Sequence, residues 1–193
     1  MAAVRIALHD RSLVLLIGPA GSGKTSFARA HFGPTEAISS DFCRALVADD
    51  ENDQSATDAA FEVLHLVVHH RLRRRRLTVV DATNVKPADR RGLLELARKH
   101  GVPAVAVVFD IAEHVCMERD RARPGRTVGA AVIRRQRQAM LRSLPELQAE
   151  GFAVVYRLDS PEAVEDVSVE RDRTPKGGPP SLLRPGSPRS PAG

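Results

Sequence analysis

The chain has 193 residues, of which 42% are hydrophobic and 27% charged, a composition that suffices for one substantial core. Two cysteines exclude a disulfide-bonded framework, and with no long apolar run and no charged-then-apolar leader segment we expect a cytoplasmic protein without a membrane partner. The net charge of +5 is weak evidence for a polyanion ligand, because residues 171–193 alone carry five basic groups against one acid.

The first predicted strand, residues 13–17, leads into a glycine-rich loop with the sequence GPAGSGKT from Gly18 to Thr25. The spacing G-x-x-x-x-G-K-T is typical of loops that hold the phosphates of a nucleoside triphosphate. Backbone amides curl around a phosphate, the lysine adds a positive charge, and the threonine hydroxyl binds Mg²⁺. We therefore predict ATP or another NTP, with Mg²⁺, held by a run of loop and helix residues: Gly18, Gly21, Ser22, Gly23, Lys24, Thr25 and Ser26.

A second strand, residues 36–39, is followed by Asp41 and Arg44 at the start of a predicted helix. Asp41 is either a helix N-cap or a general base that accepts a proton from an attacking hydroxyl. Arg44 lies three residues on and would share a helix face with Asp41, where it forms an ion pair or binds a phosphate or carboxylate of the acceptor. We predict Asp41 and Arg44 as the acceptor side of the site.

An acidic string at residues 49–53 lacks the central glycine and closing glutamate of a calcium loop. It predicts a helix start or a loop that shapes the entrance for the acceptor. A long helix is expected over residues 55–73, and the basic run from Arg71 to Arg76 complements its negative carboxyl end. We favour that structural role, with a nucleic-acid face as the alternative.

The third strand, residues 77–81, ends in Asp81. A carboxylate at the end of an apolar strand is typical of a Walker-B position, which holds Mg²⁺ directly or through water. The competing interpretation is a turn or cap residue. We predict that Asp81, acting through water, and Thr25 belong to the metal site. A helix is expected over residues 87–99.

A fourth strand, residues 104–109, precedes a cationic region with eight arginines and one acid between residues 119 and 142. Such density fits a helical lid that closes over the triphosphate and neutralises charge during transfer. The i, i+4 spacing of Arg119 and Arg123 would point both side chains the same way on a helical stem. The alternative is a solvated basic face.

A fifth strand over residues 153–157 completes an alternation of strands and helices, and we place an adenine pocket near residues 158–161. This order predicts an α/β fold of three layers, in which a parallel five-stranded sheet gathers functional groups at the carboxyl ends of its strands. Residues 1–170 form the predicted kinase domain. Residues 171–193, rich in Pro, Gly, Ser and Arg, are expected to be a disordered tail or a linker.

Several of these strings together resemble the kinase module of bacterial polynucleotide kinase-phosphatase, a P-loop phosphotransferase that heads an RNA end-healing enzyme. They are GPAGSGKT, ISSDFCR at residues 38–44, DDENDQ at residues 49–54, VVDATN at residues 79–84 and the pair Arg119 and Arg123. The resemblance runs from about Leu13 to Arg171. It implies that Asp41 is the general base, that Arg44 grips the acceptor phosphate, and that Arg119 and Arg123 engage the NTP, with Arg123 on the transferring group.

The resemblance implies a polynucleotide 5'-hydroxyl kinase that moves the γ-phosphoryl of ATP to a 5'-OH RNA or DNA end in nucleic-acid repair. Lys24, Asp41 and Arg123 are its predicted catalytic residues. The family continues into metallophosphatase and often adenylyltransferase domains, which would lie outside this sequence as partner modules. A kinase of a small metabolite or nucleoside is the first alternative. A nucleotide-dependent ATPase that binds nucleic acid and transfers phosphate to water is the second.

Overall fold

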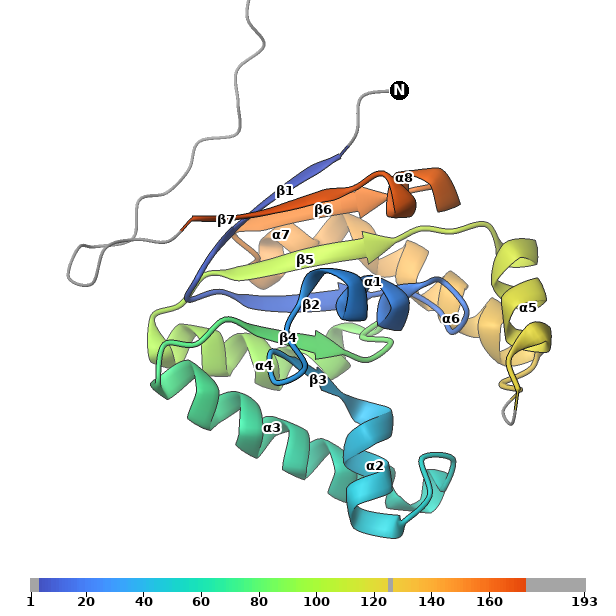
Figure 1. The fold of residues 1–193 in the computed structure, drawn as a ribbon, viewed down its shortest axis with the longest axis horizontal. Coiled ribbons are helices and arrows are strands. Elements are labelled where there is room, and N and C mark those ends of the chain that lie inside the picture. Colours follow the sequence, from blue (N-terminus) through green and yellow to red (C-terminus); the bar gives the residue numbers. More distant parts are fainter. Residues whose placement is uncertain (1–3, 125–126, 173–193) are drawn as a thin grey trace, which may run out of the picture.

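The computed structural model describes residues 4–124 and 127–172, which form a parallel five-stranded sheet between two layers (Figure 1). The strands lie in the order β3-β4-β2-β5-β6, and their bounds are Ala37–Ser39, Thr78–Asp81, Leu13–Ile17, Ala104–Phe109 and Val154–Leu158. All five and their parallel pairing were predicted, with ends shifted by at most one residue. All residues of β2, β4 and β5 are buried, as a parallel sheet covered on both faces requires.

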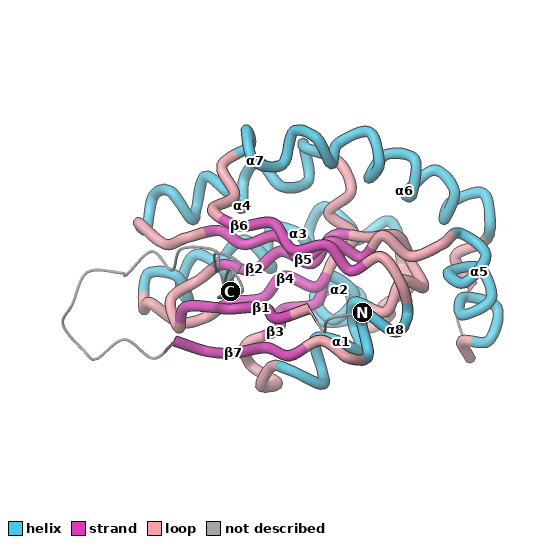
Figure 2. The backbone as a smooth tube through the Cα atoms, turned by 90° about the horizontal axis from the view of Figure 1, so that it is seen from above, coloured by secondary structure: helices cyan, strands magenta, loops and turns pink. Residues whose placement is uncertain are grey.

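Alternate residues of β2 face the two halves of the core. Leu13, Leu15 and Ile17 pack toward a layer of helices that cover one face, namely α3 (Thr57–Arg73), α4 (Pro87–His100), α6 (Ala130–Ser143) and α7 (Leu147–Glu150). Val14 and Leu16 face α1 (Lys24–His31) on the opposite side, together with residues of β1 and the segment before β7. Figure 2 shows the sheet between these two layers.

A second sheet of two parallel strands, β1 (Arg5–His9) and β7 (Ser168–Asp172), was not predicted. Its two strands lie near opposite ends of the described sequence, with Arg5 paired to Ser168. Ile6 and Leu8 are buried in the core beneath this sheet. Arg171, assigned to the tail on composition, is instead a strand residue whose guanidinium donates to Glu36 at 2.8 and 2.9 Å. The folded body therefore extends through Asp172, and residues 173–193 of the predicted tail lie outside the described residues.

Four of the remaining elements lie around the carboxyl ends of the strands, and the fifth, η2, joins α6 to α7. They are α2 (Ser40–Ala48), the short helix η1 (Gln54–Ala56), α5 (Glu113–Ala122), η2 (Leu144–Glu146) and α8 (Pro161–Glu165). Helices α5 and α6 pack against each other beyond the sheet, where the helical lid was predicted. None of the helices in the described part of the chain is both long and apolar enough to cross a bilayer.

A fully buried arginine ties the end of β4 to α7. Arg90 is 0% exposed, and its Nη1 donates to the carbonyl of Asn84 at 2.7 Å while its Nε donates to Glu150 at 2.8 Å. Asn84 itself has a left-handed backbone, with φ of 49°, and its side-chain amide donates to the Leu16 carbonyl at 2.8 Å. These bonds fix the turn after β4 against the end of β2, where the glycine-rich loop begins.

Candidate active site

A cavity of about 920 Å³ lies at the carboxyl ends of the strands. Its walls come from the glycine-rich loop, the start of α2, the segment before η1, the end of β4, the helices α5 and α6 where the lid was predicted, and α8. Most of the predicted site residues line it: Gly21, Gly23, Lys24, Thr25, Ser26, Asp41, Asp81, Arg119 and Arg123. Gly18 and Ser22 are buried behind this surface, and Arg44 is buried beneath Asp41. The structure therefore brings the donor and acceptor predictions together in one place.

The glycine-rich loop depends on residues without a side chain. Gly21 and Gly23 have φ values of 76° and 99°, a region that disfavours residues with a Cβ. A Cβ at Gly21 would also lie 2.3 Å from the Cys116 carbonyl oxygen of α5. The loop and the stem of the lid are thus in direct backbone contact, and the amide of Gly18 donates to the Thr83 carbonyl at 3.0 Å to fix the other end of the loop.

The Lys24 ammonium lies folded against the loop. Its Nζ donates to the carbonyls of Gly18 and Pro19 at 2.8 and 2.7 Å and to the Ser22 hydroxyl at 3.3 Å. Burial lowers the pKa of Lys24 from its ordinary 10.5 to about 8, although the negative charge of Asp81 opposes this shift. A buried cation at this point is held ready for an anionic ligand.

The lowered pKa makes a prediction about stability. Between pH 8 and 10.5 the unfolded chain keeps the Lys24 proton and the folded chain releases it, so the contribution of Lys24 to stability rises with pH in this window. Relative to Lys24→Met, which lacks the group, the free energy of unfolding of the wild type should rise by on the order of 3 kcal/mol across the window. Urea unfolding of both proteins at several pH values measures this difference, and a flat difference would contradict the burial argument.

Asp81 and Thr25 place a carboxylate and a hydroxyl beside the lysine. Asp81 is 6% exposed at the end of β4; burial raises its pKa, while Lys24 and a hydrogen bond from Thr25 lower it. Within the described residues, no three His, Cys, Asp or Glu side chains are grouped to bind a metal alone. A hydroxyl and one carboxylate fit a Mg²⁺ ion that takes its other ligands from water and phosphates.

Asp41 and Arg44 form an ion pair on α2, as their spacing predicted. The Arg44 Nη1 donates to Asp41 Oδ1 at 2.8 Å and to the Glu51 carbonyl at 2.9 Å. The helix is capped by Ser39, whose hydroxyl accepts the Phe42 amide, so the N-cap alternative for Asp41 is wrong. Arg44 is only 5% exposed and does not line the cavity, and its contact with an acceptor phosphate stays a prediction.

The described arginines of the predicted lid region fall into three groups: two line the cavity, two pair with acids outside it, and Arg121, Arg135 and Arg142 are exposed. Arg119 and Arg123 line the cavity, and Arg123 also pairs with Glu51 of the acidic string at 3.4 Å. The expected helical i, i+4 arrangement is wrong for Arg123, because α5 ends at Ala122 and the residue before Pro124 is extended. Two others bind acids away from the cavity: Arg134 pairs with Glu113, and Arg137 with Asp110.

The structure also adds residues that sequence reasoning missed. The Gln136 side chain of α6 accepts the Ala20 amide at 2.8 Å, so the lid helix is hydrogen-bonded to the glycine-rich loop. Nothing in the sequence distinguishes this glutamine from its polar neighbours. Asn52 and Gln54 also line the cavity, and the role of their loop at an acceptor entrance stays a prediction. Pro161, within the segment where the adenine pocket was predicted, lines the cavity as well.

A family model described as an AAA domain matches residues 13–147. That range covers the glycine-rich loop, Asp41, Asp81 and the lid. The chain belongs to this AAA-domain family. No curated protein matches the chain in sequence.

Among solved structures, a chain of the Pnkp1/Rnl/Hen1 RNA repair complex matches this AAA-domain chain at 20% identity with a TM-score of 0.62, over 72% of this chain and 47% of that one. The protein thus spans about half the length of this relative. A gluconokinase from Sinorhizobium meliloti matches at 18% identity with a TM-score of 0.51, over 82% of this chain and 90% of that one. These likenesses establish the P-loop kinase fold.

Proposed function

We propose that the protein is an ATP-dependent polynucleotide 5'-hydroxyl kinase acting on RNA or DNA ends in nucleic-acid repair. The observation that carries the proposal is that Asp41 lines the same cavity as Lys24 and Thr25. Asn52 and Gln54, from the segment that follows α2, line this cavity too. The negative charge of Asp41 also acts on the Lys24 ammonium of the loop. Support also comes from the sequence strings shared with the end-healing kinases and from the RNA repair neighbour.

In the proposed reaction, the 5'-hydroxyl oxygen attacks the γ-phosphorus of ATP and its proton passes to the Asp41 carboxylate. The bond between the γ-phosphorus and the bridging oxygen breaks, and ADP leaves with the electron pair. Such a transfer depends mainly on positioning and on neutralising charge. Lys24, Arg119 and Arg123 supply the cations, and Thr25 with Asp81 would hold Mg²⁺, which neutralises phosphate charge when bound.

A small-metabolite kinase is a second candidate, favoured by the match to nearly the full length of a gluconokinase. Four parallel incubations with γ-labelled ATP and Mg²⁺ separate the candidates. They contain a 5'-OH oligonucleotide, gluconate, a nucleoside or no acceptor. The proposal expects label on the oligonucleotide, and a 5'-phosphorylated oligonucleotide as control receives none. Label on gluconate or the nucleoside alone would establish the metabolite kinase, and phosphate release without acceptor labelling would establish an ATPase.

A further inference from the structure

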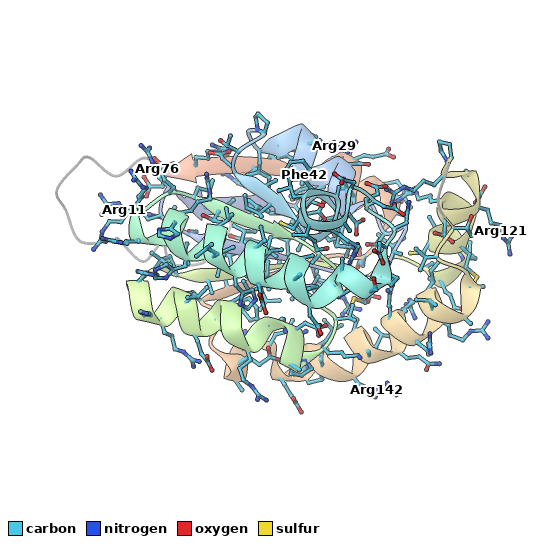
Figure 3. The ribbon with its side chains drawn as sticks, turned by 90° about the horizontal axis from the view of Figure 1, so that it is seen from below. Arg11, Arg29, Phe42, Arg76, Arg121 and Arg142 are labelled. Carbon is cyan, nitrogen blue, oxygen red and sulfur yellow. The ribbon has the colours of Figure 1, made fainter. Side chains whose placement is uncertain are left out.

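Four exposed arginines lie at the far end of the molecule from the cavity. They are Arg73, Arg74, Arg75 and Arg76, the last residue of α3 and the turn that follows it. We call them the α3-end cluster. Figure 3 shows Arg76 beside Arg11 at one end of the molecule, while Arg121 of the lid lies at the opposite end. No ion pair in the described parts of the chain involves any of the four.

Closing the helix does not require these guanidinium groups. The backbone amides of Arg74, Arg75 and Arg76 already donate to carbonyls of the last turn, between His70 and Leu72. The neighbouring Arg71 is the arginine with a structural position, since its guanidinium donates to the Leu77 carbonyl at 2.7 Å. Arg73, in the last turn of α3, still complements the negative end of the helix, while the guanidinium groups of the cluster face solvent.

Lys99 at the end of α4 adds a positive charge close to the cluster, since it and Arg73 both act on His69. The end of α4 packs beside the end of α3, where His69 Nδ1 and His100 Nε2 are 3.0 Å apart. The pKa of His69 is lowered, first by burial and then by the positive charges of its neighbours His100, Lys99, His70 and Arg73.

From this arrangement we infer that the α3-end cluster is a second polyanion-binding surface, which holds the phosphate backbone of a nucleic acid away from the reacting end. Arginine matches phosphate oxygens in a bidentate geometry, and the positive field is not cancelled by paired acids. The inference rests on the proposed function for the choice of ligand. It adds a binding site that the reaction itself does not need.

Helix α3 sets the distance between the two sites. It begins directly after Gln54–Ala56, whose first residue lines the cavity, and its 17 residues span about 25 Å. That length corresponds to roughly seven phosphates of one duplex strand. The exposed acids Asp58 and Glu62 lie on the first half of α3, so the cluster is a separate contact and not the end of a continuous basic track. Only acceptors longer than about seven nucleotides should reach it.

Binding of fluorescent oligonucleotides to the full chain, without ATP, tests the inference. The variant Arg74→Ser with Arg76→Ser removes two charges of the cluster, and Arg91→Ser with Arg142→Ser removes two exposed charges elsewhere as a matched control. With about 0.7 counterions released per phosphate on a single strand, the cluster variant should lower the salt slope for a 24-mer by up to about 1.4. Between 50 and 200 mM salt, the wild type then loses about sevenfold more affinity than the variant.

The control variant should keep the wild-type slope. In kinase assays, a 4-mer held in the cavity is too short to reach the cluster and should give the same KM with all three proteins. In kinase assays the cluster variant should raise KM for the 24-mer and leave kcat unchanged. Equal salt slopes for the two variants would overturn the inference. If the wild type binds poly-glutamate and does not bind the 24-mer, the partner is an acidic polypeptide and the inference is also overturned. If the 24-mer binds as expected but is never phosphorylated, the proposed function fails and the binding surface stands.

Discussion

The Asp41→Asn protein is expected to lose about 10²- to 10⁴-fold in kcat for 5'-OH oligonucleotides, the usual contribution of a positioned general base. Asparagine keeps the size of the side chain and an oxygen that can still accept the Arg44 bond of 2.8 Å, so the start of α2 should keep its shape. The carboxylate that takes the proton is lost. KM for ATP should change little, because the donor phosphates bind to the glycine-rich loop.

The matched control is Asp58→Asn, which removes an exposed carboxylate in the first turn of α3, away from the cavity. Steady-state kinetics with varied ATP and varied oligonucleotide separate the two effects. Unchanged kcat in Asp41→Asn would exclude a role as base. A loss confined to the KM for the oligonucleotide would make Asp41 a residue that only positions the acceptor.

Replacing Lys24 with methionine should lower kcat/KM for ATP by about 10²- to 10³-fold, the cost of removing one donor aimed at developing charge. The ammonium now held by the Gly18 and Pro19 carbonyls would turn to the triphosphate on binding. Methionine fills the same buried space without the charge. Folding should not suffer at neutral pH, because the charged amine is costly to bury there.

Loss of activity with retained thermal stability would therefore assign Lys24 to the chemistry. Arg121→Met removes an exposed charge of the lid from outside the cavity and serves as the control. ATP affinity measured by calorimetry shows whether the loss lies in binding or in the chemical step. Full activity of Lys24→Met would contradict the assignment of the loop.

The parts of the fold set by local pattern could be predicted from the sequence. The strands β2 and β5 are continuous apolar runs, and the spacing of glycines, lysine and threonine defines the loop between β2 and α1. The sheet of β1 and β7 could not be predicted, because half-exposed strands give weak signals and the partners are far apart in sequence. Their pairing depends on tertiary contacts that no local window contains.

The site residues set by local pattern could likewise be predicted, and those set by tertiary contacts could not. Asp41, Asp81 and Lys24 sit where strand ends place them, and the structure brings them around one cavity. The burial of Arg44 under the Glu51 carbonyl depends on how the acidic string folds back over α2. The bond between Gln136 and Ala20 joins residues 116 positions apart. Contacts of this kind follow from packing, which sequence spacing does not specify.

The parallel pairing of β1 with β7 has a practical consequence for anyone who attaches a tag or a further domain to this body. Parallel neighbours start at the same end and finish at the same end, so Arg5 and Asp172 lie at opposite ends of the small sheet (Figure 1). A domain fused directly to Asp172 would begin beside Asp10, whose amide donates to the Asp172 carbonyl, at the end of the molecule where Figure 3 shows Arg11 and Arg76. An addition before β1 leaves the molecule from the other end of that sheet, and is the better choice for measurements of oligonucleotide binding.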